Sequence, residues 1–143
     1  SFAAALAAFA PFVHANWEYT RFGMSHEELQ AAIKKAGSAV QTTMTGIGTS
    51  YVSNGRSYDV EFLTGGFQGP LVQVRLKPVD MNQCAAVRQD LIARHGPANG
   101  TSTTTMQGTV VGNKERWDNV RGSRITLSNS VSGTCWIDYN AAR

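Results

Sequence analysis

The spacing of apolar residues predicts a first helix that ends at Gly37. Its apolar positions recur at the interval of one helix face: Leu29, Ala32, Ile33 and Ala36. Ser25 stands before this stripe and Glu28 follows three residues later, which is the spacing of a capping box. Glycine at the end of the stripe is typical of a helix C-terminus.

A second helix with the same arrangement is predicted after Asp80. Asp80 and Gln83 again have capping-box spacing, and the apolar stripe ends before Gly96-Pro97. That stripe consists of Cys84, Val87 and Leu91. Two similar caps allow two interpretations: one domain over residues 16–143, or tandem halves over 16–70 and 71–143.

Alternating apolar and polar residues predict a set of short strands. Asn54-Gly55 favours a tight hairpin turn, because these residues tolerate positive backbone angles. Gly46 and Gly48 are expected to loosen the strand before that hairpin. The predicted strands cover 39–45, 51–53, 56–62, 72–76, 101–107, 115–120, 124–127 and 133–139. The fold expected is α+β, a curved, mostly antiparallel sheet with both helices packed on one face.

The first fifteen residues differ from the rest of the chain. They contain no Asp, Glu, Lys or Arg, and they end in the small-x-small sequence Val13-His14-Ala15. We interpret residues 1–15 as the remnant of a signal peptide, with an apolar anchor or docking helix as the alternative. The expected location is periplasmic or secreted, with membrane contact only if residues 1–15 are retained.

Cys84 and Cys135 are the only cysteines in the sequence. Both fall on predicted core-facing positions, so a disulfide is expected in an exported protein. Such a bridge would contribute about 4 kcal/mol by the loop-entropy model. Two unpaired core thiols are the alternative, and the spacing does not suit a metal site.

Charge and motifs argue against several functions. The net charge is +3, and the excess lies after residue 80, without the clustered basic face of a nucleic-acid binder. The three histidines, His14, His26 and His95, share no metal-binding spacing. The sequence contains no nucleophile elbow, phosphate loop or dinucleotide fingerprint. We therefore expect a protein that is not an enzyme and has no cofactor, no metal and no nucleic-acid partner.

The segment 114–124 is the best candidate for a protein-binding surface. Its candidate contact residues are Arg116, Trp117, Arg121 and Arg124, since arginine and tryptophan are enriched at binding hot spots. The alternative is that Trp117 packs inward and the arginines only aid solubility.

The sequence Phe22-Gly23-Met24-Ser25, followed by Glu28-Leu29, resembles the start of repeats in two exported families. These are the β-lactamase-inhibitor proteins and the small lipoprotein of the outer-membrane barrel-assembly machinery. In both, such a turn begins a helix that packs on an antiparallel sheet. The chain lacks the lipid-attachment cysteine of the lipoprotein. The leader followed by the stretch from Trp17 to Ser25 is also similar to small exported proteins of Gram-negative bacteria.

Two functions follow as hypotheses. The first is a protein-binding module, either an inhibitor or an accessory subunit of an envelope complex. The second is a binder of a small molecule or cell-wall ligand, held in a concave pocket between the sheet and the helices.

Intact mass under reducing and non-reducing conditions tests the predicted compartment. We expect the mature chain to begin at Asn16, and the mass to rise by two hydrogens on reduction. A full-length chain whose mass does not change on reduction would contradict both expectations.

Overall fold

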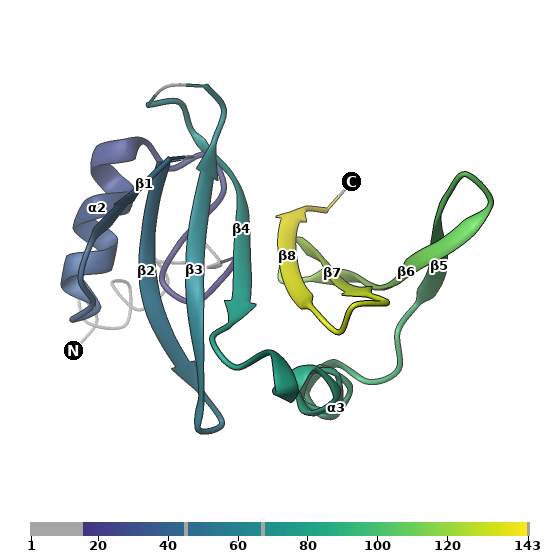
Figure 1. Cartoon of the computed structure of the whole chain (residues 1–143). Helices are drawn as coiled ribbons and strands as arrows, with labels where there is room; N and C mark the ends of the chain where they lie inside the picture. Colours follow the sequence, from purple (N-terminus) through teal and green to yellow (C-terminus); the bar gives the residue numbers. More distant parts are fainter. Residues whose placement is uncertain (1–15, 45, 67, 143) are drawn as a thin grey trace, which may run out of the picture.

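A computed structural model describes residues 16–44, 46–66 and 68–142. The predicted signal peptide, residues 1–15, therefore lies outside the described part of the chain. The elements, labelled as in Figure 1, are α2 (His26–Lys35), β1 (Gln41–Thr43), β2 (Gly46–Ser53), β3 (Arg56–Thr64), β4 (Leu71–Pro78), the 3-10 turn η1 (Met81–Gln83), α3 (Cys84–His95), β5 (Gly100–Met106), β6 (Thr109–Val120), β7 (Ser123–Ser130) and β8 (Cys135–Ala141).

The eight strands form one antiparallel sheet in the order β1-β2-β3-β4-β8-β7-β6-β5. The sheet is open and curved, with β1 at one edge and β5 at the other (Figure 1). Both helices bury their apolar stripes in a single core on one face of this sheet. The predicted α+β fold, with its curved sheet and two helices on one face, is confirmed.

Each half of the chain supplies a helix followed by four strands, and the halves meet where β4 pairs with β8. In the structure β4, which begins at Leu71, is the last strand of the first half. The predicted boundary after residue 70 instead assigned this strand to the second half. A shared element order does not establish a duplication, so the tandem halves stay a prediction.

The first helix begins as the sequence indicates. The Ser25 hydroxyl accepts a hydrogen bond from the Glu28 amide at 3.1 Å, and the Glu28 carboxylate accepts one from the Ser25 amide at 3.0 Å. The hydrogen bond from the Ser25 amide lowers the pKa of Glu28, because it stabilises the charged carboxylate. Leu29 and Ile33 are buried, and Gly37 has the positive φ of 81° that ends the helix.

The second helix departs from the prediction at its start. Asp80 accepts a hydrogen bond from the Asn82 amide and thereby caps η1. The α-helix begins only after η1, at Cys84, and not directly after Asp80. Gln83 stands at the N-cap of α3 and makes no side-chain capping bond. The predicted capping box of Asp80 and Gln83 is therefore wrong. Within the described residues, neither helix is long and apolar enough to cross a membrane.

Several strands extend further than their sequence pattern suggested. β2 begins at Gly46 and runs through Gly48, so the expected loosening at these glycines is wrong. Gly48 is required by close packing, because a Cβ there would lie 2.8 Å from the Val60 carbonyl oxygen. β6 begins at Thr109, six residues before the predicted start.

The predicted hairpin turn at Asn54-Gly55 is present, with φ of 52° and 73°. A similar turn at Arg121-Gly122, with φ of 54° and 76°, joins β6 to β7. Gly122 adopts this backbone without strain, whereas Arg121 depends on its surroundings. The Arg121 carbonyl accepts a hydrogen bond from the Asn16 side chain at 2.9 Å, which holds the turn against the N-terminal loop.

The predicted disulfide between Cys84 and Cys135 is present, with a Cα–Cα distance of 6.0 Å. It joins the first turn of α3 to the first residue of β8. Two ion pairs hold the same helix to strands of both halves, Arg56–Asp90 from β3 and Arg88–Glu115 from β6. α3 is thus linked to strands of both halves and stabilises their junction on the helix-covered face.

Replacing Cys84→Ser and Cys135→Ser together should lower the free energy of unfolding by about 4 kcal/mol, because the bridge closes a 51-residue separation in the unfolded chain. Urea unfolding followed by circular dichroism measures this change. Reduced wild type is the control and should match the double variant. A double variant as stable as the oxidised wild type would contradict the prediction.

Candidate functional site

Trp117 belongs to the core and not to a contact surface. Its side chain is 1% exposed, and its indole N–H donates a hydrogen bond to the Gly96 carbonyl at 2.8 Å. The strand pairing explains this burial, because Trp117 stands opposite Ile125 on the helix-covered face. Trp117 is therefore removed from the predicted binding surface, and the inward alternative is correct.

The three arginines of the predicted surface lie in two places. Arg116 and Arg124 lie on the helix-free face, where both approach the Asp118 carboxylate, at 3.0 and 3.2 Å. Arg121 occupies the β6–β7 turn and lines a pocket on the opposite side of the sheet. The structure thus brings Arg116 and Arg124 together and separates them from Arg121.

The centre of the helix-free face is hollowed by a shallow pocket of about 520 Å³. Four adjacent strands form its floor, namely β4, β8, β7 and β6. The side chains that matter for its chemistry are Gln73, Arg75, Lys114, Arg124, Thr126, Ser128, Trp136, Asp138 and Asn140. We call this group the sheet-face site.

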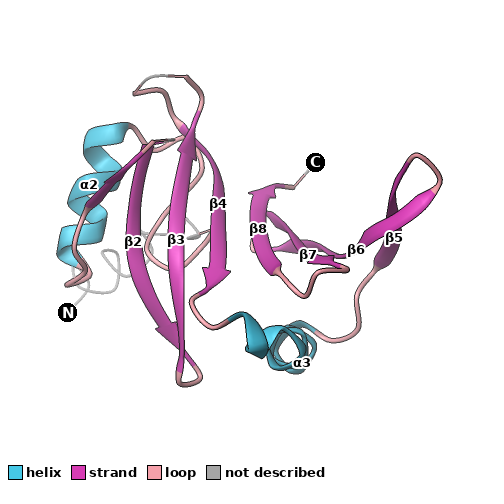
Figure 2. Ribbon diagram, in the orientation of Figure 1, coloured by secondary structure: helices cyan, strands magenta, loops and turns pink. Residues whose placement is uncertain are grey.

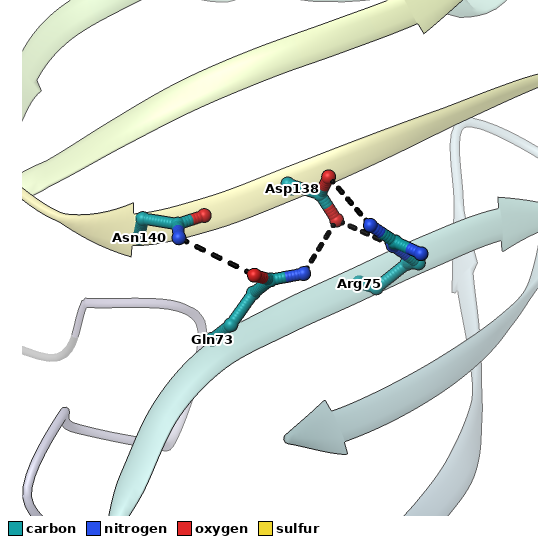
Figure 3. Close-up of polar contacts among 4 residues, drawn as sticks. All are labelled: Gln73, Arg75, Asp138 and Asn140. Carbon is teal, nitrogen blue, oxygen red and sulfur yellow. Dashed lines mark hydrogen bonds and ion pairs between the residues drawn. The ribbon is translucent and has the colours of Figure 1, made fainter. Parts of the chain in front are cut away.

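A polar network spans the β4–β8 pairing on this face (Figure 3). Asp138 accepts two hydrogen bonds from the Arg75 guanidinium, at 2.7 and 3.0 Å, and a third from Gln73 at 3.0 Å. Asn140 donates to the Gln73 side-chain oxygen at 3.3 Å. Hydrogen bonding to Asp138 raises the pKa of Arg75. Arg75 is therefore held in one orientation by a bidentate charged pair.

Trp136 provides an aromatic surface beside this network. The Arg75 guanidinium carbon lies 5.4 Å from the centre of the Trp136 ring, within the range of a cation–π contact. Trp136 pairs with Ser128 of β7, and its side chain is partly exposed. The sheet-face site thus contains a partly exposed tryptophan next to an arginine whose position is fixed.

Positive charge predominates on the helix-free side of these four strands. Its cations are Arg75, Lys77, Lys114, Arg116 and Arg124, and its carboxylates are Asp118 and Asp138. Five cations against two carboxylates leave an excess of three, equal to the net charge of the whole chain. The second half contributes Lys114, Arg116 and Arg124 against both carboxylates, an excess of one. Arg75 and Lys77 belong to the first half, where β3 pairs them with Glu61 and Asp59.

Most of the sheet-face site was missed by the sequence reasoning. A signal was present, since Gln73 and Arg75 alternate with buried Val74, and Asp138 alternates with buried Ile137. That alternation shows only that these side chains leave the core. Their proximity requires the β4–β8 register, which pairs Arg75 with Asp138.

A second pocket, of about 560 Å³, lies between the sheet and α3. Its apolar wall includes Leu76, Val87 and Ile137, and Asp90, Arg94 and His95 contribute polar groups. The small-molecule hypothesis predicted a concave apolar pocket with convergent polar groups in this region. Within the described residues, no three His, Cys, Asp or Glu side chains form a group that could hold a metal ion.

Asp138→Asn should lower the free energy of unfolding by about 2 kcal/mol, because it leaves the half-buried Arg75 without its charged acceptor. The matched control is Asp118→Asn on the same face, where the carboxylate is 40% exposed and a loss below about 1 kcal/mol is expected. Urea unfolding of both variants measures the difference. Equal losses would contradict a special role for Asp138.

Comparison of the chain with protein-family models, with curated proteins and with solved structures found no match.

Proposed function

We propose that the protein is a non-enzymatic exported module that binds another protein through its helix-free sheet face, as an inhibitor or as an accessory subunit of an envelope complex. The observation that carries the proposal is the cationic hollow of the sheet-face site, with Trp136 beside Arg75 at its centre. Arginine and tryptophan are enriched among the residues that contribute most binding energy at the centre of protein interfaces.

The rigidity of this surface supports a binding role. The floor is a continuous antiparallel ladder from β4 to β6, and Arg75 is held by both oxygens of Asp138. Side chains that are ordered before association lose less conformational entropy when a partner binds. A preorganised Arg75–Trp136 pair is therefore a better anchor than freely moving surface arginines.

The charge of the face determines the class of partner. Lys114 and Arg124 line the hollow without the bidentate pairing that neutralises Arg75. Their positive potential favours a protein surface with exposed Asp and Glu, which gains association rate and correct orientation from complementary charge. The proposed partner is accordingly a protein with an acidic patch.

The disulfide supports the proposed compartment. Disulfides persist in oxidising environments outside the cytosol, and Cys84–Cys135 is such a bridge. The apolar start of the chain and the resemblance to exported inhibitor and lipoprotein repeats agree with a periplasmic or secreted location.

A second candidate function is a binder of a small molecule or cell-wall ligand. The pocket of about 560 Å³ beside α3 favours it, because ligand sites are clefts of this size with apolar walls and a few polar groups. The two functions use opposite faces of the sheet and do not exclude each other.

Charge reversal of the sheet-face site should weaken partner capture. Tagged full-length protein would be crosslinked in extracts of its native cell envelope, and the captured proteins identified by mass spectrometry. We expect Lys114→Glu with Arg124→Glu to reduce recovery of an acidic partner at least about tenfold at low salt, since steering and pairing charges are both lost.

The matched control is Lys34→Glu with Lys35→Glu, an equal change of charge at the exposed end of α2. This control should retain the partner, and crosslinks from the wild type should map to Lys77 or Lys114. Equal capture by both double variants, or crosslinks confined to α2, would contradict the proposal.

A further inference from the structure

The pocket beside α3 has a wall that suits a flat apolar ring. Tyr51, Tyr58 and Trp17 contribute aromatic groups, and Leu76 and Ile137 contribute aliphatic ones. The Trp17 ring packs edge-on against Tyr51 with centroids 5.0 Å apart, so the aromatic wall is fixed by its own contacts. A ring entering this pocket would meet side chains that already hold their positions.

Tyr139 places an unused hydrogen-bonding group in this pocket. Its side chain lines the pocket, and only 9% of the residue is exposed. Among the described residues, no hydrogen bond stabilises its hydroxyl, and the oxygen is not one of the fully buried unpaired atoms. Burial raises the pKa of Tyr139, so the group is a neutral phenol at physiological pH. The Tyr139 hydroxyl is therefore free of protein partners among the described residues, and a ligand atom in the pocket would provide one.

Two arginines give the pocket a positive rim. Arg94 and Arg121 both line it, and the polar contact of the Arg94 guanidinium is a 3.3 Å hydrogen bond to the Ser53 hydroxyl. Asp90 also lines the pocket, but both of its oxygens accept hydrogen bonds from Arg56, at 2.8 and 2.9 Å. Glu18 is the remaining carboxylate, and it lies beside the Tyr51 hydroxyl.

The state of His95 agrees with this charge balance. Burial, and next to it the charges of Arg94 and Arg121, lower the pKa of His95. The imidazole is therefore neutral at pH 7 and adds no charge to the rim. Two guanidinium groups face one exposed carboxylate, which leaves a net positive charge at the entrance.

We propose that this pocket binds a small aromatic carboxylate, with the ring between the aromatic wall and α3, and the carboxylate held by Arg94 and Arg121 and accepting a hydrogen bond from the Tyr139 hydroxyl. The assignment rests on the second candidate function and names its ligand class. It is independent of the sheet-face site, because the two pockets have no lining residue in common.

The charge and shape of the pocket distinguish this ligand from others. A neutral sugar would leave both arginines without a charged partner, and a cation would be repelled by them. A long fatty acid needs a deep apolar tunnel, whereas this wall contains the hydroxyls of three tyrosines. A flat ring with one carboxylate uses the apolar wall and the charged rim together.

The test uses 2-naphthoate and its neutral isostere 2-naphthamide, titrated into the full-length protein and followed by calorimetry. We expect saturable one-site binding of naphthoate, and binding of naphthamide at least about tenfold weaker, because the charge-assisted contact is lost. Arg94→Gln should weaken naphthoate about tenfold. Tyr139→Phe keeps the ring and should weaken it by about three- to tenfold.

Arg88→Gln is the matched control, since Arg88 lies on the same helix but pairs with Glu115 outside the pocket. This variant, and the sheet-face variant Lys114→Glu with Arg124→Glu, should bind naphthoate as the wild type does. Thermal unfolding confirms that each variant is folded. Three outcomes would each overturn the proposal. The first is no saturable binding of naphthoate, and the second is equal affinity for naphthoate and naphthamide. The third is naphthoate binding that neither Arg94→Gln nor Tyr139→Phe changes.

Discussion

The pairing of β4 with β8 is the contact on which the rest of the structure depends. It joins the two halves of the sheet through four residue pairs, from Gln73–Asn140 to Leu76–Ile137. On the helix-covered side, Val74 and Tyr139 meet across it in the core, and on the other side Arg75 meets Asp138. Both candidate sites lie over this junction, so each exists only when the two halves are paired.

A junction of four residue pairs is short, and other contacts stabilise it from the helix-covered face. α3 is tied to β8 by the disulfide and to β3 and β6 by ion pairs. The N-terminal loop contributes as well, because Trp17 packs on Phe62 while Asn16 bonds to the β6–β7 turn. Figure 2 shows α3 below the region where the two groups of strands meet. The core is therefore continuous across both halves, and neither half closes its apolar face alone.

The opposite faces of the junction have different chemistry because a strand sends successive side chains to opposite sides. This alternation was readable in β4 and β8 from the sequence, including the outward position of Trp136. The same reasoning missed the position of Trp117. β6 begins six residues earlier than predicted and has an irregular pairing after Trp117, so its facing could not be assigned from a short segment. The side chains of Arg116 and Arg124 are 42% and 43% exposed, and their binding role stays a prediction.

The sequence by itself determined the features that depend on neighbouring residues: the Ser25 capping box, the Asn54-Gly55 turn, the alternation of the strands and the α+β class. It also indicated the Cys84–Cys135 disulfide, because both cysteines occur on core-facing positions. The tertiary structure alone decided the strand order, the register of β4 on β8 and the two pockets. These features join residues more than sixty positions apart, such as Arg75 and Asp138. Local patterns show which side chains leave the core, but only the register of distant strands determines which of them meet.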